Sequence, residues 1–207
     1  MSRIPTPATI EAAPAASRPL LEAVKQQLGI APNLFRLVSN SPAALEGYLS
    51  LSGALAKGAL PAPTRERIAL AIAEINGCSY CLSAHTYLGK NLAKLDDAEI
   101  TANRNGSSND AQAEAAVTFA VRVARERGHI SEADLRAVKS AGYNDAQVIE
   151  MVLHVSARRA EHLDQLHQRG REDRDRLPHR HCATGCVSPG FQTASPVMRI
   201  ASPARHV

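Results

Sequence analysis

The stretch E-R-I-A-L-A-I-A-E-I-N-G-C-S-Y-C-L-S-A-H, residues 66–85, decides how this chain folds and what it can do. It contains a C-x-x-C pair, Cys78 and Cys81. His85 lies four residues after the second cysteine, and Glu66 lies twelve residues before the first. Four groups that move protons or electrons therefore lie in one short segment of a chain with few aromatic residues.

Two consecutive helices are predicted on either side of a break at residues 76–77, an Asn-Gly pair. The first is apolar on nearly all sides, so we expect it to be buried. Thr64 is the expected N-cap, which would put Glu66 in the first turn. The second helix is expected from about Cys78 to Leu92. The cysteines then lie at the N-terminus of the second helix of a hairpin.

The rest of the chain also favours helices, and no alternating strand pattern occurs, so we predict an all-α fold. Residues 1–16, rich in Pro and Ala, are expected to form an extended N-terminal arm, and residues 17–156 an all-α domain. Residues 157–207 differ in character and form an atypical tail rich in Arg and His. Besides the hairpin, helices are expected from Ser17 to a stop at Gly29 and over residues 43–57, 96–103, 111–127, 133–140 and 146 onward.

Composition excludes several classes of protein. The 207 residues are 44% hydrophobic, which is normal for a globular chain, and no apolar run approaches the roughly 18 residues that span a membrane. We expect a cytoplasmic protein without a signal peptide. The net charge is +4, but residues 157–207 hold nine Arg and five acids, whereas residues 1–156 are neutral. Nothing in the neutral part indicates a nucleic-acid surface.

The spacing of the cysteines suits thiol chemistry. Two residues three apart on a helix share one face and can close a disulfide. The positive end of a helix favours a thiolate, and His85, one turn beyond Cys81, can accept the thiol proton. Glu66 could relay that proton through the cysteines or a water. A dithiol that cycles with a disulfide is the resulting hypothesis.

Less specific interpretations exist for each group. The C-x-x-C pair could be half of a zinc site completed by Cys182 and Cys186, or a buried structural pair. Glu66 alone would be a first-turn helix carboxylate, and His85 alone a polar helix residue. Tyr80 would serve packing, and His154 a structural role. Only the joint spacing favours the functional interpretation, for which we expect no metal and no cofactor.

The spacing E-x11-C-x2-C-x3-H, formed by Glu66, Cys78, Cys81 and His85, resembles the active-site motif of the alkylhydroperoxidase D-like (AhpD-like) family. This family lies within the carboxymuconolactone decarboxylase superfamily. The segments R-E-R-I-A-L-A-I-A-E-I-N-G-C-S-Y-C-L-S-A-H-T and S-P-A-A-L-E-G-Y-L-S-L-S-G-A-L are similar to the longer, peroxidase-related members. The resemblance covers roughly residues 15–155.

This resemblance implies an all-helical enzyme that assembles as trimers or hexamers and reduces hydroperoxides. Cys81 would be the peroxidatic cysteine, Cys78 the resolving one, and Glu66 and His85 the proton relay. The partners would be a hydroperoxide substrate and a thiol or dithiol reductant, which can be a protein. Tyr80 is a departure, because some members have a second histidine between the cysteines. The alternative is a disulfide oxidoreductase or redox-sensing protein without peroxidase turnover.

The tail does not resemble the end of that family. Permissible codons for Ser156–His181, read one base later, encode A-L-D-V-L-N-T-W-T-N-Y-I-N-E-V-A-K-T-E-I-D-F-P-T-V, which contains the family's T-N-Y and T-E-I-D-F-P elements. Our hypothesis is that a frameshift near Ser156 replaced the native C-terminus. It would account for the missing Trp and for the absence of Lys after residue 156. The alternative is a genuine basic, disordered appendage.

Overall fold

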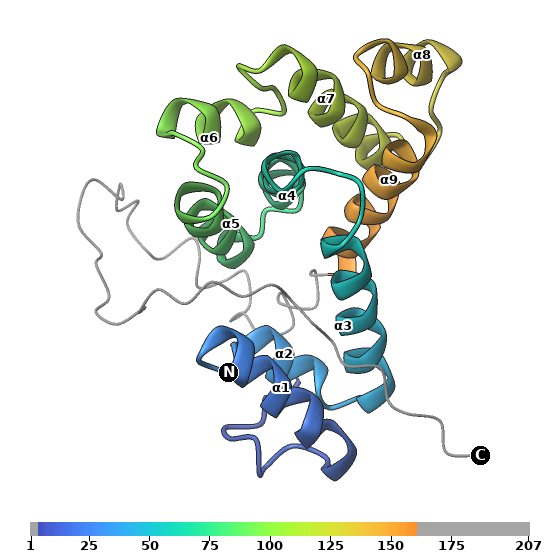
Figure 1. The fold of residues 1–207 in the computed structure, drawn as a ribbon. Helices are drawn as coiled ribbons and strands as arrows, with labels where there is room; N and C mark the ends of the chain where they lie inside the picture. Colours follow the sequence, from blue (N-terminus) through green and yellow to red (C-terminus); the bar gives the residue numbers. More distant parts are fainter. Residues whose placement is uncertain (1–3, 161–207) are drawn as a thin grey trace. The chain divides into compact units, whose positions relative to one another are not determined.

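The computed structural model describes residues 4–160, and these form an all-α structure without strands (Figure 1). The prediction of the fold class is confirmed. The described residues divide into two compact units, 4–45 and 46–160. The predicted tail lies almost entirely outside the described residues. The helices are α1 (Arg18–Leu28), α2 (Asn33–Val38), α3 (Pro42–Ala56), α4 (Ala62–Ile75), α5 (Ser79–Asn91), α6 (Asp97–Arg104), α7 (Ala111–Arg125), α8 (Glu132–Ser140) and α9 (Asp145–Ala160).

In the first unit, the N-terminal segment packs against α2. Arg36 donates to the carbonyls of Pro7 and Ala8 at 3.0 and 2.6 Å, and Ala13 is buried. Ser17 precedes α1 as predicted, but its hydroxyl does not cap the helix. It donates instead to the buried carbonyl of Ser39 at 2.7 Å, which ties the start of α1 to the end of α2.

In the second unit, α4 is the central helix and packs against α5, α6, α7 and α9 (Figure 1). A helix that contacts four neighbours must be apolar on nearly every side, as its sequence indicated. Its fully buried members include Ile68, Leu70 and Ile72. The core around it is made mostly of small and aliphatic side chains, with Phe119 and Tyr143 as its aromatic members.

The start of α4 differs from the prediction. The helix begins at Ala62, with Pro61 as its N-cap and Pro63 within its first turn. Proline fits there because its missing N–H would have no intrahelical partner. Thr64 is therefore a buried helical residue and not the cap. Glu66 consequently lies beyond the first turn, so a first-turn dipole role does not account for it.

The helices after α5 begin with the expected capping chemistry. Asp96 caps α6 and Asp110 caps α7, each accepting a backbone N–H. Ser131 and Asp134 form a capping box on α8. Asn144 caps α9 by a reciprocal exchange with Gln147, with both bonds at 3.0 Å.

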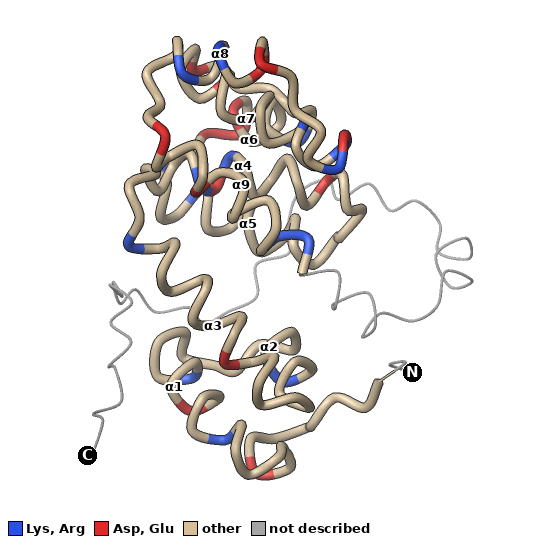
Figure 2. Tube along the Cα trace, turned by 90° about the vertical axis from the view of Figure 1, so that its right-hand side faces the viewer, with Lys and Arg blue, Asp and Glu red and all other residues tan. Residues whose placement is uncertain are grey.

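Charged residues of both signs are scattered along the described chain (Figure 2). Among residues 4–160, no helix has the length and hydropathy needed to cross a membrane.

Candidate functional site

The turn between α4 and α5 places the cysteines. Gly77 has a φ of +62°, which is the left-handed conformation that glycine adopts without strain. The N–H of Gly77 bonds to the carbonyl of Glu74, and the N–H of Cys78 bonds to that of Ala73. This pair of bonds is a Schellman motif, which ends α4 and reverses the chain. The Asn-Gly break predicted from the sequence is therefore confirmed.

Cys78 is the last residue of that motif and also the N-cap of α5. Its Sγ accepts the backbone N–H of Cys81 at 3.1 Å, which is the bond a capping side chain makes. The two cysteines form a disulfide with their Cα atoms 5.3 Å apart. When the disulfide is reduced, the same N–H and the positive end of α5 can stabilise a thiolate on Cys78.

His85 and Glu66 meet beside the cysteine pair. Oε2 of Glu66 lies 2.8 Å from Nδ1 of His85, so α4 and α5 each contribute one partner of this contact. His85 is only 5% exposed, and the side chain of Glu66 is about one-fifth exposed. The contact is direct, so no cysteine or water is needed between the two groups. Cys78, Cys81, His85 and Glu66 are thus brought together in the second unit.

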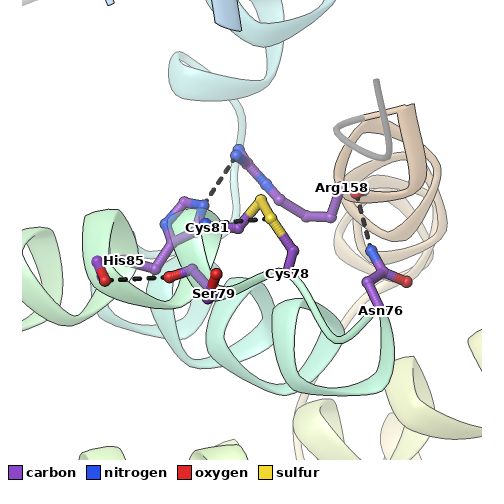
Figure 3. The surroundings of a disulfide bond; sticks show 7 residues. Asn76, Cys78, Ser79, Cys81, His85 and Arg158 are labelled. Carbon is purple, nitrogen blue, oxygen red and sulfur yellow. Dashed lines mark hydrogen bonds between the residues drawn. A yellow bond between two sulfur atoms is a disulfide. The ribbon is translucent and has the colours of Figure 1, made fainter. Parts of the chain in front are cut away.

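Arg158, near the end of α9, is a further member of the site. Its Nη1 lies 3.2 Å from Nε2 of His85, and its backbone carbonyl accepts the side-chain amide of Asn76 at 3.1 Å (Figure 3). Asn76 belongs to the break between α4 and α5. The end of α9 therefore contacts one residue that precedes the two cysteines in sequence and one that follows them.

His154 lies one turn before Arg158 and is buried, at 4% exposure. Burial lowers its pKa to about 4, with further lowering by the positive charges of Arg158 and Arg65. Glu150 and Glu66 oppose this effect. His154 is consequently a neutral imidazole at neutral pH, as suits a buried structural histidine.

A buried carboxylate, Glu99, lies on another side of α4. Arg67 donates to Glu99 of α6 at 2.6 Å, and Glu99 also accepts from Ser108, Asn103 and the backbone N–H of Asn109. Burial raises the pKa of Glu99, but the hydrogen bonds outweigh it and hold the pKa at about 2. This cluster fixes the loop between α6 and α7 and does not contact the disulfide.

No group of three or more His, Cys, Asp or Glu residues within residues 4–160 is arranged to hold a metal ion. Cys182 and Cys186, which would complete the alternative zinc site, lie outside the described residues. Tyr80, between the two cysteines, is 37% exposed.

One family model matches part of the chain. Residues 42–126 match the carboxymuconolactone decarboxylase family. This match contains Glu66, both cysteines of the disulfide and His85. No curated protein sequence matches the chain.

Solved structures place the fold more narrowly. An AhpD-core, peroxidase-related protein from Ralstonia eutropha JMP134 superposes with a TM-score of 0.70 at 23% identity, covering 83% of this chain and 93% of that one. A peroxidase-related protein from Silicibacter sp. TM1040 gives 0.67 at 22%, with 81% and 93% covered. The debrominase Bmp8 gives 0.62 at 19%, with 82% and 94% covered. The described part of the chain therefore has the AhpD-like fold, and its residues 42–126 match the carboxymuconolactone decarboxylase family.

Sequence reasoning brought out four of these residues and missed Arg158. The four share one segment of 20 residues, whereas Arg158 follows His85 by 73 positions. It also falls within the part of the chain assigned to the atypical tail. Helix α9 continues to Ala160, past that boundary. Its position four residues after the buried His154, on the same helix face, is the only sequence signal that would have indicated it.

Proposed function

We propose that the chain is a thiol-dependent hydroperoxide reductase that cycles between a Cys78–Cys81 dithiol and its disulfide. The observation that carries the proposal is the 2.8 Å contact of Glu66 with His85, directly beside a disulfide at the N-terminus of α5. A structural disulfide needs neither a buried imidazole nor a carboxylate. A redox dithiol needs a group that accepts and returns its protons.

The first half of the cycle consumes the substrate. His85 accepts the proton of the Cys81 thiol, and the Cys81 thiolate attacks the terminal oxygen of the hydroperoxide ROOH. The S–O bond forms as the O–O bond breaks, which leaves Cys81 as a sulfenic acid. The departing alkoxide takes the proton from His85 and leaves as the alcohol ROH. Glu66 supports the imidazolium that forms between these steps.

The second half closes and reopens the disulfide. The Cys78 thiolate attacks the sulfur of the Cys81 sulfenic acid, and hydroxide leaves and is protonated to water. Two thiols of an external reductant then reduce the disulfide by exchange. If the reductant attacks Cys81, the leaving group is the Cys78 thiolate, whose Sγ already accepts the N–H of Cys81. The balance is ROOH plus two thiols giving ROH, water and one disulfide.

The burial of the reacting sulfurs favours small substrates. Cys78 is 1% and Cys81 is 4% exposed, so a bulky hydroperoxide cannot reach either sulfur without movement of the surrounding side chains. We therefore propose hydrogen peroxide and short alkyl hydroperoxides as the substrate class. The peroxidase-related proteins of the same fold support this choice of chemistry.

Stopped-flow consumption of hydrogen peroxide and of ethyl hydroperoxide by the reduced chain tests the proposal. Cys81→Ser should abolish turnover. Cys78→Ser should consume one peroxide per chain and retain a sulfenic acid or a mixed disulfide on Cys81. The matched control is Cys182→Ser with Cys186→Ser, which removes the other two cysteines of the chain and should leave turnover unchanged. Equal activity of the Cys81→Ser variant would overturn the assignment.

Two other outcomes define the alternatives. Rapid disulfide exchange with a protein dithiol, without peroxide consumption, would identify a disulfide oxidoreductase or a redox-sensing protein. Thiol-dependent release of bromide from a bromopyrrole would instead point to dehalogenation, because a Bmp8 variant of this fold has been crystallised with 2,3,4-tribromopyrrole. We also propose a homo-oligomer, a trimer or hexamer, which light scattering after size-exclusion chromatography tests.

A further inference from the structure

Arg158 is held at the dithiol site by both its side chain and its backbone. The guanidinium faces Nε2 of His85, and the carbonyl accepts the amide of Asn76 (Figure 3). The aliphatic part of the side chain extends from α9 toward α5 in this view, with the guanidinium end directed at the imidazole. An arginine on the surface of a helix end would not need two such anchors.

The partners of His85 determine where its proton lies. Arginine has five N–H donors and no acceptor, and it keeps its charge at all relevant pH values. Nε2 of His85 must therefore be the acceptor in the contact with Arg158. A neutral imidazole with an acceptor at Nε2 carries its proton on Nδ1, and that proton points at Oε2 of Glu66. The two contacts together are compatible with only one protonation state of the ring.

We propose that Arg158 is a positioning residue of the dithiol site, which keeps His85 neutral with its proton on Nδ1 and with an unprotonated Nε2. The importance of that state rests on the proposed function, in which His85 accepts the proton of Cys81. The state itself does not depend on turnover. It is set in the disulfide form, before any substrate or reductant binds.

The role follows from the opposing charges on the two sides of the ring. Glu66 alone would favour an imidazolium, which has no lone pair and cannot accept a thiol proton. The positive charge of Arg158 disfavours that second proton. When the disulfide is reduced and the Cys81 proton moves to Nε2, the guanidinium loses its acceptor. A thiolate is then the better partner for it, because charge-assisted hydrogen bonds are stronger than neutral ones.

Other charged and titratable groups lie near the contact between α4 and α9. Glu66 and Arg65 face α9 from α4, and His154 and Glu150 lie on α9 itself. The pKa of His154 is lowered to about 4, so this histidine does not titrate near neutral pH. Titration of His154 therefore does not contribute to a pH profile measured between about pH 6 and 9.

Nitrogen-15 NMR of the histidine rings tests the proposal in the disulfide form. The wild-type His85 signals, assigned with a His85→Gln variant, should show a protonated Nδ1 and an unprotonated Nε2 at pH 7. Arg158→Met keeps the length of the side chain but removes its charge and donors, and should shift His85 toward imidazolium or the other tautomer. Arg158→Lys should restore the wild-type signals. The matched control is Arg159→Met, since Arg159 instead donates to the carbonyl of Ala124.

The reduced form gives a second readout. In a Cys78→Ser, Cys182→Ser, Cys186→Ser background, alkylation of Cys81 by iodoacetamide is followed against pH. Arg158→Met should move the midpoint of this profile up by about one pH unit or more, the size expected from loss of a nearby opposite charge. Thermal unfolding of each variant shows whether it is folded.

An imidazolium or an Nε2–H tautomer in the wild-type disulfide form would overturn the proposal. An alkylation midpoint that Arg158→Met and Arg159→Met change equally would do the same. If the wild-type signals are as expected but no peroxide is consumed, the proposed function fails and the role of Arg158 stands.

Discussion

Glu66 and Arg67 are neighbours in α4, but their side chains bind partners on different helices. Glu66 contacts His85 on α5 at 2.8 Å, and Arg67 donates to Glu99 on α6 at 2.6 Å. Consecutive helical residues point about 100° apart, so one turn of α4 serves the dithiol site on one side and anchors α6 on the other. Activity and stability are therefore separable by mutations at adjacent positions.

Replacement of Glu66 by Gln is expected to lower peroxide turnover about a hundredfold, the lower end of what general acid–base groups contribute. The amide still accepts the Nδ1 proton of His85 but supplies no negative charge, so the imidazolium formed during the reaction is less stable. Stability should change little, because the Glu66 side chain is partly exposed. The measurement is kcat/KM for hydrogen peroxide, with Glu74→Gln, on the same helix, as the control.

A Glu66→Gln enzyme with wild-type kcat/KM would show that the carboxylate has no part in proton transfer. An equal loss in Glu74→Gln would point to a general effect of charge on α4. Glu74 pairs with the exposed Arg104 at the surface, so its removal should leave turnover intact.

Acid should weaken the fold through Glu99. Its pKa is about 2 in the folded protein against an ordinary value of 4.5, so the folded state prefers the ionised form. This contribution to the free energy of unfolding is present in full above about pH 4.5 and is lost as the pH falls toward 2. The gap corresponds to roughly 3 kcal/mol at most. Urea unfolding of wild type and Glu99→Gln at pH 7, 5, 4 and 3 measures it.

The difference between the two proteins in that series is the informative quantity. It should be constant from pH 7 to pH 5 and shrink at pH 4 and pH 3. The pKa of Asp134 is lowered by its bonds to Ser131, so acid also weakens the fold through this residue. That contribution is the same in wild type and Glu99→Gln, so it cancels in the difference. A difference that does not vary with pH would mean that Glu99 acts only through packing.

The hairpin that carries the site could be predicted because its signals are local. Gly77 and the cysteines lie within five residues, and the Schellman motif depends on backbone geometry that an Asn-Gly pair favours. The start of α4 was placed wrongly because Thr64 has the side chain of an N-cap. The N-cap is instead Pro61. Pro63 lies within the first turn of the helix, where a proline is tolerated just as it is in a linker.

Arg158 and the burial of His154 could not be predicted for a different reason. Both depend on α9 packing against α4 and α5, and no local pattern encodes a contact between residues so far apart in sequence. The apolar spacing of α9 indicated a buried face but not which helix it meets. The direct contact of Glu66 with His85 was not predicted either. The sequence suggested only a proton relay through the cysteines or a water.

The left-handed turn at Gly77 should be sensitive to a side chain. Gly77→Ala has open space around the added Cβ but forces alanine into a φ of +62°, which costs about 1–2 kcal/mol. Gly47→Ala, in α3 with open space and no positive φ, should instead be neutral or slightly stabilising. Chemical denaturation of both variants compares them. Because the turn also positions Cys78, Gly77→Ala should lower peroxide turnover, and a fully stable and active variant would contradict this.

The frameshift hypothesis makes a prediction about the whole chain. The shifted reading of residues 156–181 contains Trp, Tyr, Ile and Val in place of repeated Arg and His, so it offers more apolar surface to bury. A frame-restored protein should therefore unfold at a higher temperature and assemble more completely than this chain, as measured by thermal unfolding and by light scattering. The shifted reading places an Asp at position 158, so the histidine NMR experiment on the frame-restored protein should not show the His85 signals expected for this chain. Gene sequencing is the direct test, because a gene in which no single-base change near codon 156 restores the family ending contradicts the hypothesis. In that case the basic residues belong to the protein, and with them the contact between Arg158 and His85.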